Sequence, residues 1–424
     1  MTERKDNSHI TSGSSFVEEL DRRLTLPNFT FGDPEKDEEE FYIYLPYSDL
    51  RGWIYERETI GKAASIFPLW RLQEVRSLSF VSMTLEAQPN PLVALEQPQT
   101  RFSHTLVVAR TMEAIMRNND FDEQDIQTGI VAAMLHDIAT PALGDATKKI
   151  DPANLDEEDW WWEVLDEGSW AYLESIGATR EQIDDIIHNK GILGQVLDIA
   201  DRIGYTMIDL ERSGANIIPG IRPDIGNIFK DVRVDKETGR VYFEDYQRLG
   251  NFLYVRAWFF RNVYINPYNQ GSDFLFLRLI EPFYRPDESE ASGKLTPNLL
   301  RRMADQDLVK FLAERYTPGR PWYTFTKSVL WFPKFERFDS LEKAESRVQE
   351  ISRGPDSKVI GIKEGQRFNP SLDYLTKNED GEIVEYREAE PFQALLIHRK
   401  SESMRGFYVF YADSGDLDLV RYLP

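Results

Sequence analysis

Apolar residues recur at helical spacing through the first two thirds of the chain. From Ile60 to about Leu210 they return every three or four positions, as expected for helices with one buried face. One such face consists of Leu106, Ala109, Met112 and Ile115. The pattern predicts further helices over 246–264, 273–283 and 297–316, with a polar loop at 286–293. A helical core is therefore expected.

After Pro321 the pattern changes to short runs typical of β-strands. These runs are YTFTKSVLWF, KVIGIK, FQALLIHRK and GFYVFYA. One helical segment is expected at 341–351, and Asn-Pro and Asp-Gly signals predict an exposed hairpin or loop over 369–388. The predicted fold class is mainly α, with a helical core and a smaller C-terminal α+β lobe.

The length of 424 residues allows two or three packed units at about 150 residues each. The chain is polar to about Ser15 and charge-dense from Asp33 to Glu40, which predicts a flexible N-terminal arm over 1–40. The predicted helical domain covers 41–318, and the predicted C-terminal lobe covers 319–424.

The chain is strongly acidic, with 72 Asp and Glu against 50 Lys and Arg and a net charge of −22. This field repels duplex nucleic acid and anionic membranes, whereas a small anionic ligand can still bind in a local pocket. No apolar run approaches the roughly 18 residues of a membrane span, and the first residues lack a signal-peptide core. The absence of cysteine excludes disulfides and thiolate metal sites. We therefore expect a soluble, cytoplasmic protein whose metals are bound by His and carboxylates.

The placement of the scarce histidines predicts a metal site. His104 falls near the start of a helix, His136 and Asp137 fall at a helix end broken by Pro141, and Asp201 lies inside another helix. Such an N/O ligand set suits Mn, Fe, Mg, Ni or Zn. A divalent cation lowers the pKa of water and neutralises phosphoryl charge, so the site predicts hydrolysis of a phosphoester or phosphoanhydride.

A lone His-Asp pair is also typical of a helix cap or of a hydrogen-bonded core group. Four such residues in apolar helices favour the metal, because an unpaired buried charge is costly.

The order H…HD…D resembles the metal signature of the HD-domain phosphohydrolase superfamily. Further segments resemble its deoxynucleoside triphosphate triphosphohydrolase-like subgroup, which includes the vertebrate SAM-and-HD-domain dNTPase. These segments are SDLRGWI at 48–54, PLWRL at 68–72, TRFSH at 100–104, ADRIGY at 200–205 with Asp209, and the stretches 255–264 and 299–312. The resemblance covers about residues 45–315 and includes no SAM domain.

This resemblance implies an all-helical HD core, removal of triphosphate from a dNTP, and assembly into a dimer or higher oligomer. It implies that the metal is bound by His104, His136, Asp137 and Asp201. It implies that the substrate is bound by Arg101, Arg202, Tyr205, Asp209 and Tyr264, with the arginines on phosphates and Tyr205 with Asp209 on the sugar. The alternative for Arg202 or Asp209 is a salt bridge on a helix face, and for Tyr264 a position in the core.

The chain departs from the family pattern where proton transfer is expected. Thr140 and Asp145 stand where the family carries further histidines, and Ser77 stands where it often carries the glutamine that holds the sugar. Glu163 or His188 is then the candidate general acid, which with Asp137 gives the predicted catalytic set. The alternatives are a solvated helix residue for Glu163 and a helix C-terminal histidine for His188.

Three functions remain open from the sequence. The first is a metal-dependent nucleotide phosphohydrolase, with dNTP hydrolysis as its specific form. The second is a catalytically weak HD protein that works as a nucleotide-binding regulatory module, and the third is an HD phosphohydrolase on another phosphate ester. Self-association is also expected, because the C-terminal lobe carries more aromatic side chains than it easily buries, including Trp331, Phe332, Phe407 and Tyr408.

Overall fold

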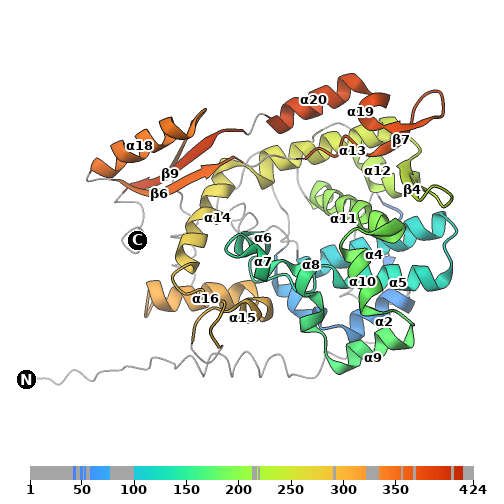
Figure 1. The fold of residues 1–424 in the computed structure, drawn as a ribbon, viewed down its shortest axis with the longest axis horizontal. Helices are drawn as coiled ribbons and strands as arrows, with labels where there is room; N and C mark the ends of the chain where they lie inside the picture. The colour runs from blue at the N-terminus through green and yellow to red at the C-terminus, as the bar shows by residue number, and fades with distance from the viewer. Residues whose placement is uncertain are drawn as a thin grey trace, which may run out of the picture.

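The computed structural model describes residues 42–43, 48–50, 52–53, 58–76, 100–212, 217, 220–289, 293–320, 334–354, 357–365, 369–402 and 405–413. The expected N-terminal arm, the strand run at 323–332 and the residues Ser77, Trp331 and Phe332 lie outside this part. The described chain is mainly helical with small sheets, as the sequence predicts (Figure 1).

The first helices build a bundle around α4 and α11, which pack on each other. Their bounds are α2 Glu58–Ile66, η1 Leu69–Glu74, α4 Arg101–Asn118, α5 Glu123–Leu135, α6 Gly144–Lys148, α7 Pro152–Leu155, α8 Glu157–Trp160, η2 Trp161–Val164, α9 Glu167–Ser175, α10 Arg180–Ile187 and α11 Gly191–Arg212. Thr100 caps α4 by accepting a hydrogen bond from the amide of Ser103, and Asp122 caps α5 in the same way. Gly204 permits the close crossing, because a Cβ there would lie 3.0 Å from Val108 Cγ2.

The later helices follow the predicted stretches with internal breaks. Their bounds are α12 Ile221–Gly226, η3 Ile228–Asp231, α13 Tyr246–Phe259, the π-helix η4 Phe260–Tyr264, α14 Pro267–Ile280, α15 Pro297–Arg302 and α16 Asp305–Tyr316. The predicted helix over 297–316 is two helices, because the chain is extended at Met303 and Ala304. Asp307 accepts a hydrogen bond from the Ala304 amide at 3.1 Å and so stabilises the start of the second helix.

One sheet joins the helical region to the C-terminal third. Its order is β3 (Val232–Asp235), β4 (Arg240–Phe243), β7 (Leu375–Lys377) and β8 (Ile383–Glu385). β4 and β7 pair in parallel across more than 130 residues of sequence. A separate two-stranded sheet pairs β1 (Tyr42–Ile43) with β2 (Gly52–Trp53).

One expectation for the C-terminal third is wrong, and a second holds only in part. FQALLIHRK, predicted as a strand, lies in the helix α20 (Pro391–Glu402), which follows α19 (Tyr386–Ala389). Its buried residues Ala394, Ile397 and Ser401 have helical spacing, and α20 packs along α13 (Figure 1). The stretch 369–388 does contain the predicted hairpin, but Ser371 and Tyr386 are buried in it instead of exposed.

The remaining strands form a sheet with the order β5 (Lys334–Phe338), β9 (Phe407–Asp413), β6 (Ser357–Glu364). The predicted strands KVIGIK and GFYVFYA are therefore confirmed. The predicted helix is also confirmed as α18 (Leu341–Arg353), which packs on this sheet. Tyr408 and Phe410 are buried in a core cluster shared with α14 and α16.

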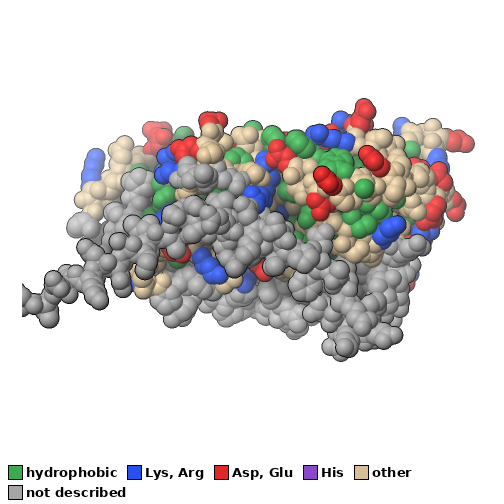
Figure 2. All heavy atoms as spheres, turned by 90° about the horizontal axis from the view of Figure 1, so that it is seen from below, with side chains coloured by type: hydrophobic (Ala, Val, Ile, Leu, Met, Phe, Trp, Pro, Cys, Tyr) green, Lys and Arg blue, Asp and Glu red, His purple; other side chains and the backbone are tan. Residues whose placement is uncertain are grey.

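Acidic and basic side chains are interspersed among the described residues of the face in Figure 2. Within the described chain, no helix combines the length and apolar character that crossing a bilayer requires.

Candidate metal centre

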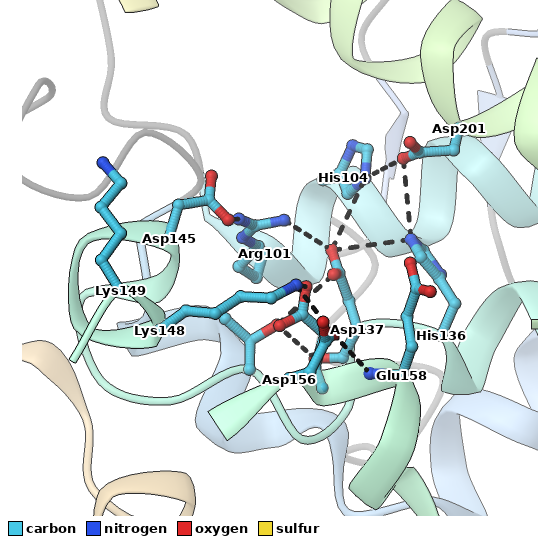
Figure 3. Close-up of polar contacts among 12 residues, drawn as sticks. Arg101, His104, His136, Asp137, Asp145, Lys148, Lys149, Asp156, Glu158 and Asp201 are labelled. Atoms are coloured by element: carbon cyan, nitrogen blue, oxygen red, sulfur yellow. Dashed lines mark hydrogen bonds and ion pairs between the residues drawn. The ribbon is translucent and has the colours of Figure 1, made fainter. Parts of the chain in front are cut away.

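Three helices bring the four predicted metal ligands together. His104 lies in the first turn of α4, His136 and Asp137 follow the end of α5, and Asp201 lies in the middle of α11 (Figure 3). His104 Nε2 lies 2.9 Å from Asp201 Oδ1 and 3.6 Å from Asp137 Oδ2. His136 Nε2 lies 3.6 Å from Asp137 Oδ2 and 3.7 Å from Asp201 Oδ1. The two imidazoles and two carboxylates therefore face one point.

The ligand atoms of this cluster suit a cation. Those of His104, His136 and Asp137 lie within 4.8 Å of one another, and all three residues are buried. His136 Nδ1 lies 2.7 Å from the Ala133 carbonyl, which fixes the ring, while the buried Nε2 has no hydrogen-bond partner in the described chain. Asp201 is more open, with its side chain 35% exposed. The buried set can bind a divalent metal ion, and Asp201 is placed to join it.

Electrostatics at the cluster favour a positive charge. Burial opposes protonation of His136, but Asp137 and Asp201 outweigh it and raise its pKa to about 9. Burial likewise opposes ionisation of Asp137, but Arg101 and the two histidines outweigh it and lower its pKa to about 2. The pKa of Asp201 is also lowered, because its interactions with His104 and His136 exceed the effect of burial. A divalent cation would take the place of the proton on His136.

Several side chains hold the turn that carries Asp137. Thr140 donates a hydrogen bond to the Asp137 carbonyl at 2.7 Å. Arg101 bridges Asp137 at 3.0 Å and Asp145 at 3.3 Å. Arg71 donates to the carbonyl oxygens of Ile138 and Thr140 at 2.9 and 2.8 Å. The turn that carries Asp137 is thus fixed from three sides.

A second charged group next to the cluster was missed by the sequence reasoning. Lys148 Nζ lies 2.8 Å from Asp156 (Figure 3) and 3.1 Å from Glu157. Burial, with Asp137 and Asp145 nearby, raises the pKa of Glu157 to about 7. The segment DEEDW carries no motif that marks these residues, because Lys148 meets Asp156 and Glu157 only once α6 and α8 have folded.

The structure gives both candidate general acids other partners. Glu163 forms an ion pair with the buried Arg301 at 2.8 Å. His188 caps the end of α10, where its Nε2 lies 3.0 Å from Asp159. Burial opposes the charged form of His188, but its hydrogen bonds with Asp159 and Asp184 raise its pKa. No contact found among the described residues joins either group to the metal ligands, so their catalytic role stays a prediction.

A third carboxyl group, that of Glu158, interacts electrostatically with the cluster. Burial raises its pKa, while His136 and His188 oppose the rise. Glu158 therefore interacts electrostatically with His136, one of the predicted metal ligands.

The residues predicted to bind the substrate sugar lie further along α11 and on η4. The hydroxyl of Tyr264 donates to Asp209, and the rings of Tyr205 and Tyr264 meet edge to face at 6.3 Å. Arg256 of α13, which the sequence reasoning did not single out, donates to the Tyr205 hydroxyl. Arg202 pairs with Asp198 at 2.6 Å. The structure thus brings Tyr205, Asp209 and Tyr264 together, with Tyr205 about one helical turn and Asp209 about two turns beyond Asp201 on α11.

Comparisons with known proteins place the fold. No family model and no curated protein matches the chain. A hypothetical protein from Aquifex aeolicus is 18% identical with a TM-score of 0.61, over 88% of this chain and 96% of that one. A phosphohydrolase from Bacteroides thetaiotaomicron is 15% identical with a TM-score of 0.59, over 81% of this chain and 93% of that one.

These likenesses establish a fold class that includes a phosphohydrolase. Within that fold, this chain carries a buried His and Asp cluster that can hold a divalent metal.

Proposed function

We propose that this chain is an HD-type, metal-dependent nucleotide phosphohydrolase, and that its specific reaction is hydrolysis of a dNTP to a deoxynucleoside and triphosphate. The observation that carries the proposal is the convergence of His104, His136, Asp137 and Asp201 on one point. The likeness to a phosphohydrolase fold supports it.

Cationic side chains beside the cluster support a phosphorylated ligand. Arg101 lies against Asp137, and Arg202 lies on α11, the helix that carries Asp201. Guanidinium groups bind phosphate oxygens through two parallel hydrogen bonds. A phosphate chain bound between them would lie over the metal ligands, where a bound divalent cation supplies charge neutralisation and lowers the pKa of water.

The tyrosines of α11 and η4 support a sugar contact. Tyr205 and Asp209 are four residues apart on one helix face, and Asp201 lies one turn earlier on the same face. If the Tyr205 ring packs against C2′, a ribose hydroxyl would clash or be buried without a partner. That penalty of about 1 to 3 kcal/mol favours dNTP over NTP by about ten- to a hundredfold.

The test is a substrate screen with products identified by mass. Purified protein reconstituted with Mn, Fe, Mg, Ni or Zn is offered dNTPs, NTPs and common phosphate esters. Release of triphosphate supports the proposal, whereas release of monophosphate alone indicates a phosphohydrolase for another ester. Nucleotide binding without turnover indicates the regulatory module.

The double variant His136→Ala/Asp137→Ala tests the site itself. It is expected to lose bound metal and turnover while keeping its helical circular dichroism. The control His398→Ala/Asp380→Ala removes an exposed histidine and an exposed aspartate, and it should keep both the bound metal and the turnover. Stoichiometric metal in the first variant would show that the site lies elsewhere.

Two variants test the sugar assignment. Tyr205→Ala should erode the preference for dATP over ATP, while Asp209→Ala should weaken hydrolysis of both. Equal hydrolysis of ATP and dATP by the unchanged protein would contradict the assignment.

Self-association is proposed from the family resemblance alone. Tyr408 is buried within the chain and Phe407 packs in a small cluster, so neither supports a surplus of exposed aromatics. Sedimentation of a monomer at micromolar concentration, with and without nucleotide, would contradict it.

A further inference from the structure

Two arginines from different helices converge on one serine of the C-terminal third. Arg202 of α11 donates to Ser371 Oγ at 2.5 Å, and Arg256 of α13 donates to the same oxygen at 2.9 Å. Ser371 is 1% exposed. It lies 169 and 115 residues from the two arginines in sequence.

This arrangement brings two positive charges to a neutral acceptor. Like charges repel, so the fold must hold both guanidinium groups in place. Tyr205 accepts a hydrogen bond from Arg256 Nε, and Asp198 accepts one from Arg202 Nη2 at 2.6 Å. Tyr205, which accepts from Arg256, lies about one helical turn after Asp201 on α11, so this contact stands next to the candidate metal cluster.

The segment that carries Ser371 is firmly held. Ser371 has a φ of 53°, which lies in the left-handed region, and its amide donates to Asn369 Oδ1 at 3.0 Å. The Tyr374 carbonyl accepts from the Tyr386 amide at 2.8 Å, and the Leu372 carbonyl accepts from the Arg387 amide at 3.1 Å. The serine is therefore part of a fixed wall.

Tyr374 extends this wall over the same arginine. Its hydroxyl donates to Asp198 Oδ2 at 3.4 Å, and the Arg202 guanidinium lies 5.5 Å from the centre of its ring. Leu372 and Tyr374 also pack against the main hydrophobic core.

We propose that Ser371 is a positioning residue: its hydroxyl holds Arg202 and Arg256 together as a paired clamp for the phosphates of the ligand, so that the C-terminal third completes the site. This inference rests on the proposed function, because it takes the ligand to be phosphorylated. A preformed pair binds phosphate better, since the cost of ordering two long side chains is met during folding.

The test measures binding of inorganic tripolyphosphate by calorimetry to the metal-reconstituted protein, with free Mn²⁺ held constant. Ser371→Ala removes the hydroxyl and keeps a side chain at the positive φ. Ser371→Gly removes it in a residue that tolerates this φ. Both variants are expected to bind tripolyphosphate about tenfold more weakly, with unchanged metal content. With a hydrolysed nucleotide, KM should rise about tenfold while kcat changes less than twofold.

The matched control is Ser401→Ala, another buried serine of the C-terminal third, whose hydroxyl donates to the His398 carbonyl. It should bind tripolyphosphate like the unchanged protein. Three results would overturn the inference: no binding by the unchanged protein, affinity in both Ser371 variants equal to or above that of the unchanged protein, or an equal loss in Ser401→Ala.

The proposed function can fail separately, because tripolyphosphate binding needs no turnover. If the protein binds tripolyphosphate and the Ser371 variants bind it more weakly, but no substrate is hydrolysed, the inference about Ser371 stands and the proposed enzymatic function does not.

Discussion

Replacing Arg71 by methionine should loosen the turn that presents Asp137. The Arg71 side chain is 5% exposed and donates to three carbonyl oxygens, those of Ile138, Thr140 and Met303 at 2.9, 2.8 and 3.1 Å. Methionine fills a similar volume but donates no hydrogen bond, so the variant isolates the loss of these contacts.

The magnitude follows from two opposing effects. Three hydrogen bonds from a charged donor contribute about 6 kcal/mol at about 2 kcal/mol each. Burial, only partly offset by Asp305, lowers the pKa of Arg71 from 12.5 to about 10, which corresponds to about 3 kcal/mol against the charged form. The net loss of unfolding free energy in Arg71→Met is therefore about 3 kcal/mol. Metal affinity should fall about tenfold, because Asp137 loses its support.

Urea denaturation followed by tryptophan fluorescence measures the first effect, and competition with a metal chelator measures the second. The control is Arg278→Met, which removes an arginine from an exposed pair with Glu281 and should change stability by less than about 1 kcal/mol. If Arg71→Met keeps both the stability and the metal affinity of the unchanged protein, the carbonyl contacts do not fix the turn.

Two further predictions concern the surroundings of the cluster. The pKa of Glu157 is raised from 4.5 to about 7, so its contribution to stability is fully present below about pH 4.5 and is lost as the pH rises to about 7. We expect the free energy of unfolding of metal-free Glu157→Gln, relative to the unchanged protein, to rise by about 2 to 3 kcal/mol between pH 4.5 and 8. If this difference between the two proteins does not change with pH, the pKa of Glu157 is not raised by burial. Gly204→Ala places a methyl 3.0 Å from Val108 Cγ2 and should cost about 1 to 3 kcal/mol while weakening metal binding, since it separates the helices of His104 and Asp201. Normal metal affinity in that variant would show that the crossing tolerates the methyl.

The sequence was sufficient to group the histidines and aspartates of the candidate metal cluster, because histidine is scarce in this chain. With five histidines in 424 residues, the placement of His104 and His136 at helix ends was itself informative. Helical periodicity over 101–135 placed them on neighbouring helices, and the structure confirms that α4 and α5 pack together. Asp137 and Asp201 complete the set because a buried charge needs partners.

The short strands and the helix α20 were harder to predict from the sequence, because contacts with distant parts of the chain stabilise them. β3 and β4 are four residues each, and β4 gains its second partner only from β7, more than 130 residues later. FQALLIHRK has enough β-forming character to mislead over nine residues, yet its buried face is set by packing on α13. Short apolar runs leave helix and strand unresolved until their neighbours are known.

The same reasoning explains why Ser371 carried no signal. A serine in a polar loop is ordinary in sequence, and the two arginines that give it a role come from helices more than 100 residues away. The left-handed φ at Ser371 goes with a local hydrogen bond from its amide to Asn369, and the hairpin that follows is tied back when the Tyr386 amide donates to the Tyr374 carbonyl. The hydroxyl that joins Arg202 to Arg256 thus comes from the C-terminal third, whereas His104, His136, Asp137 and Asp201 all come from α4, α5 and α11, so a chain cut before residue 369 should keep the histidine cluster but lose the arginine clamp.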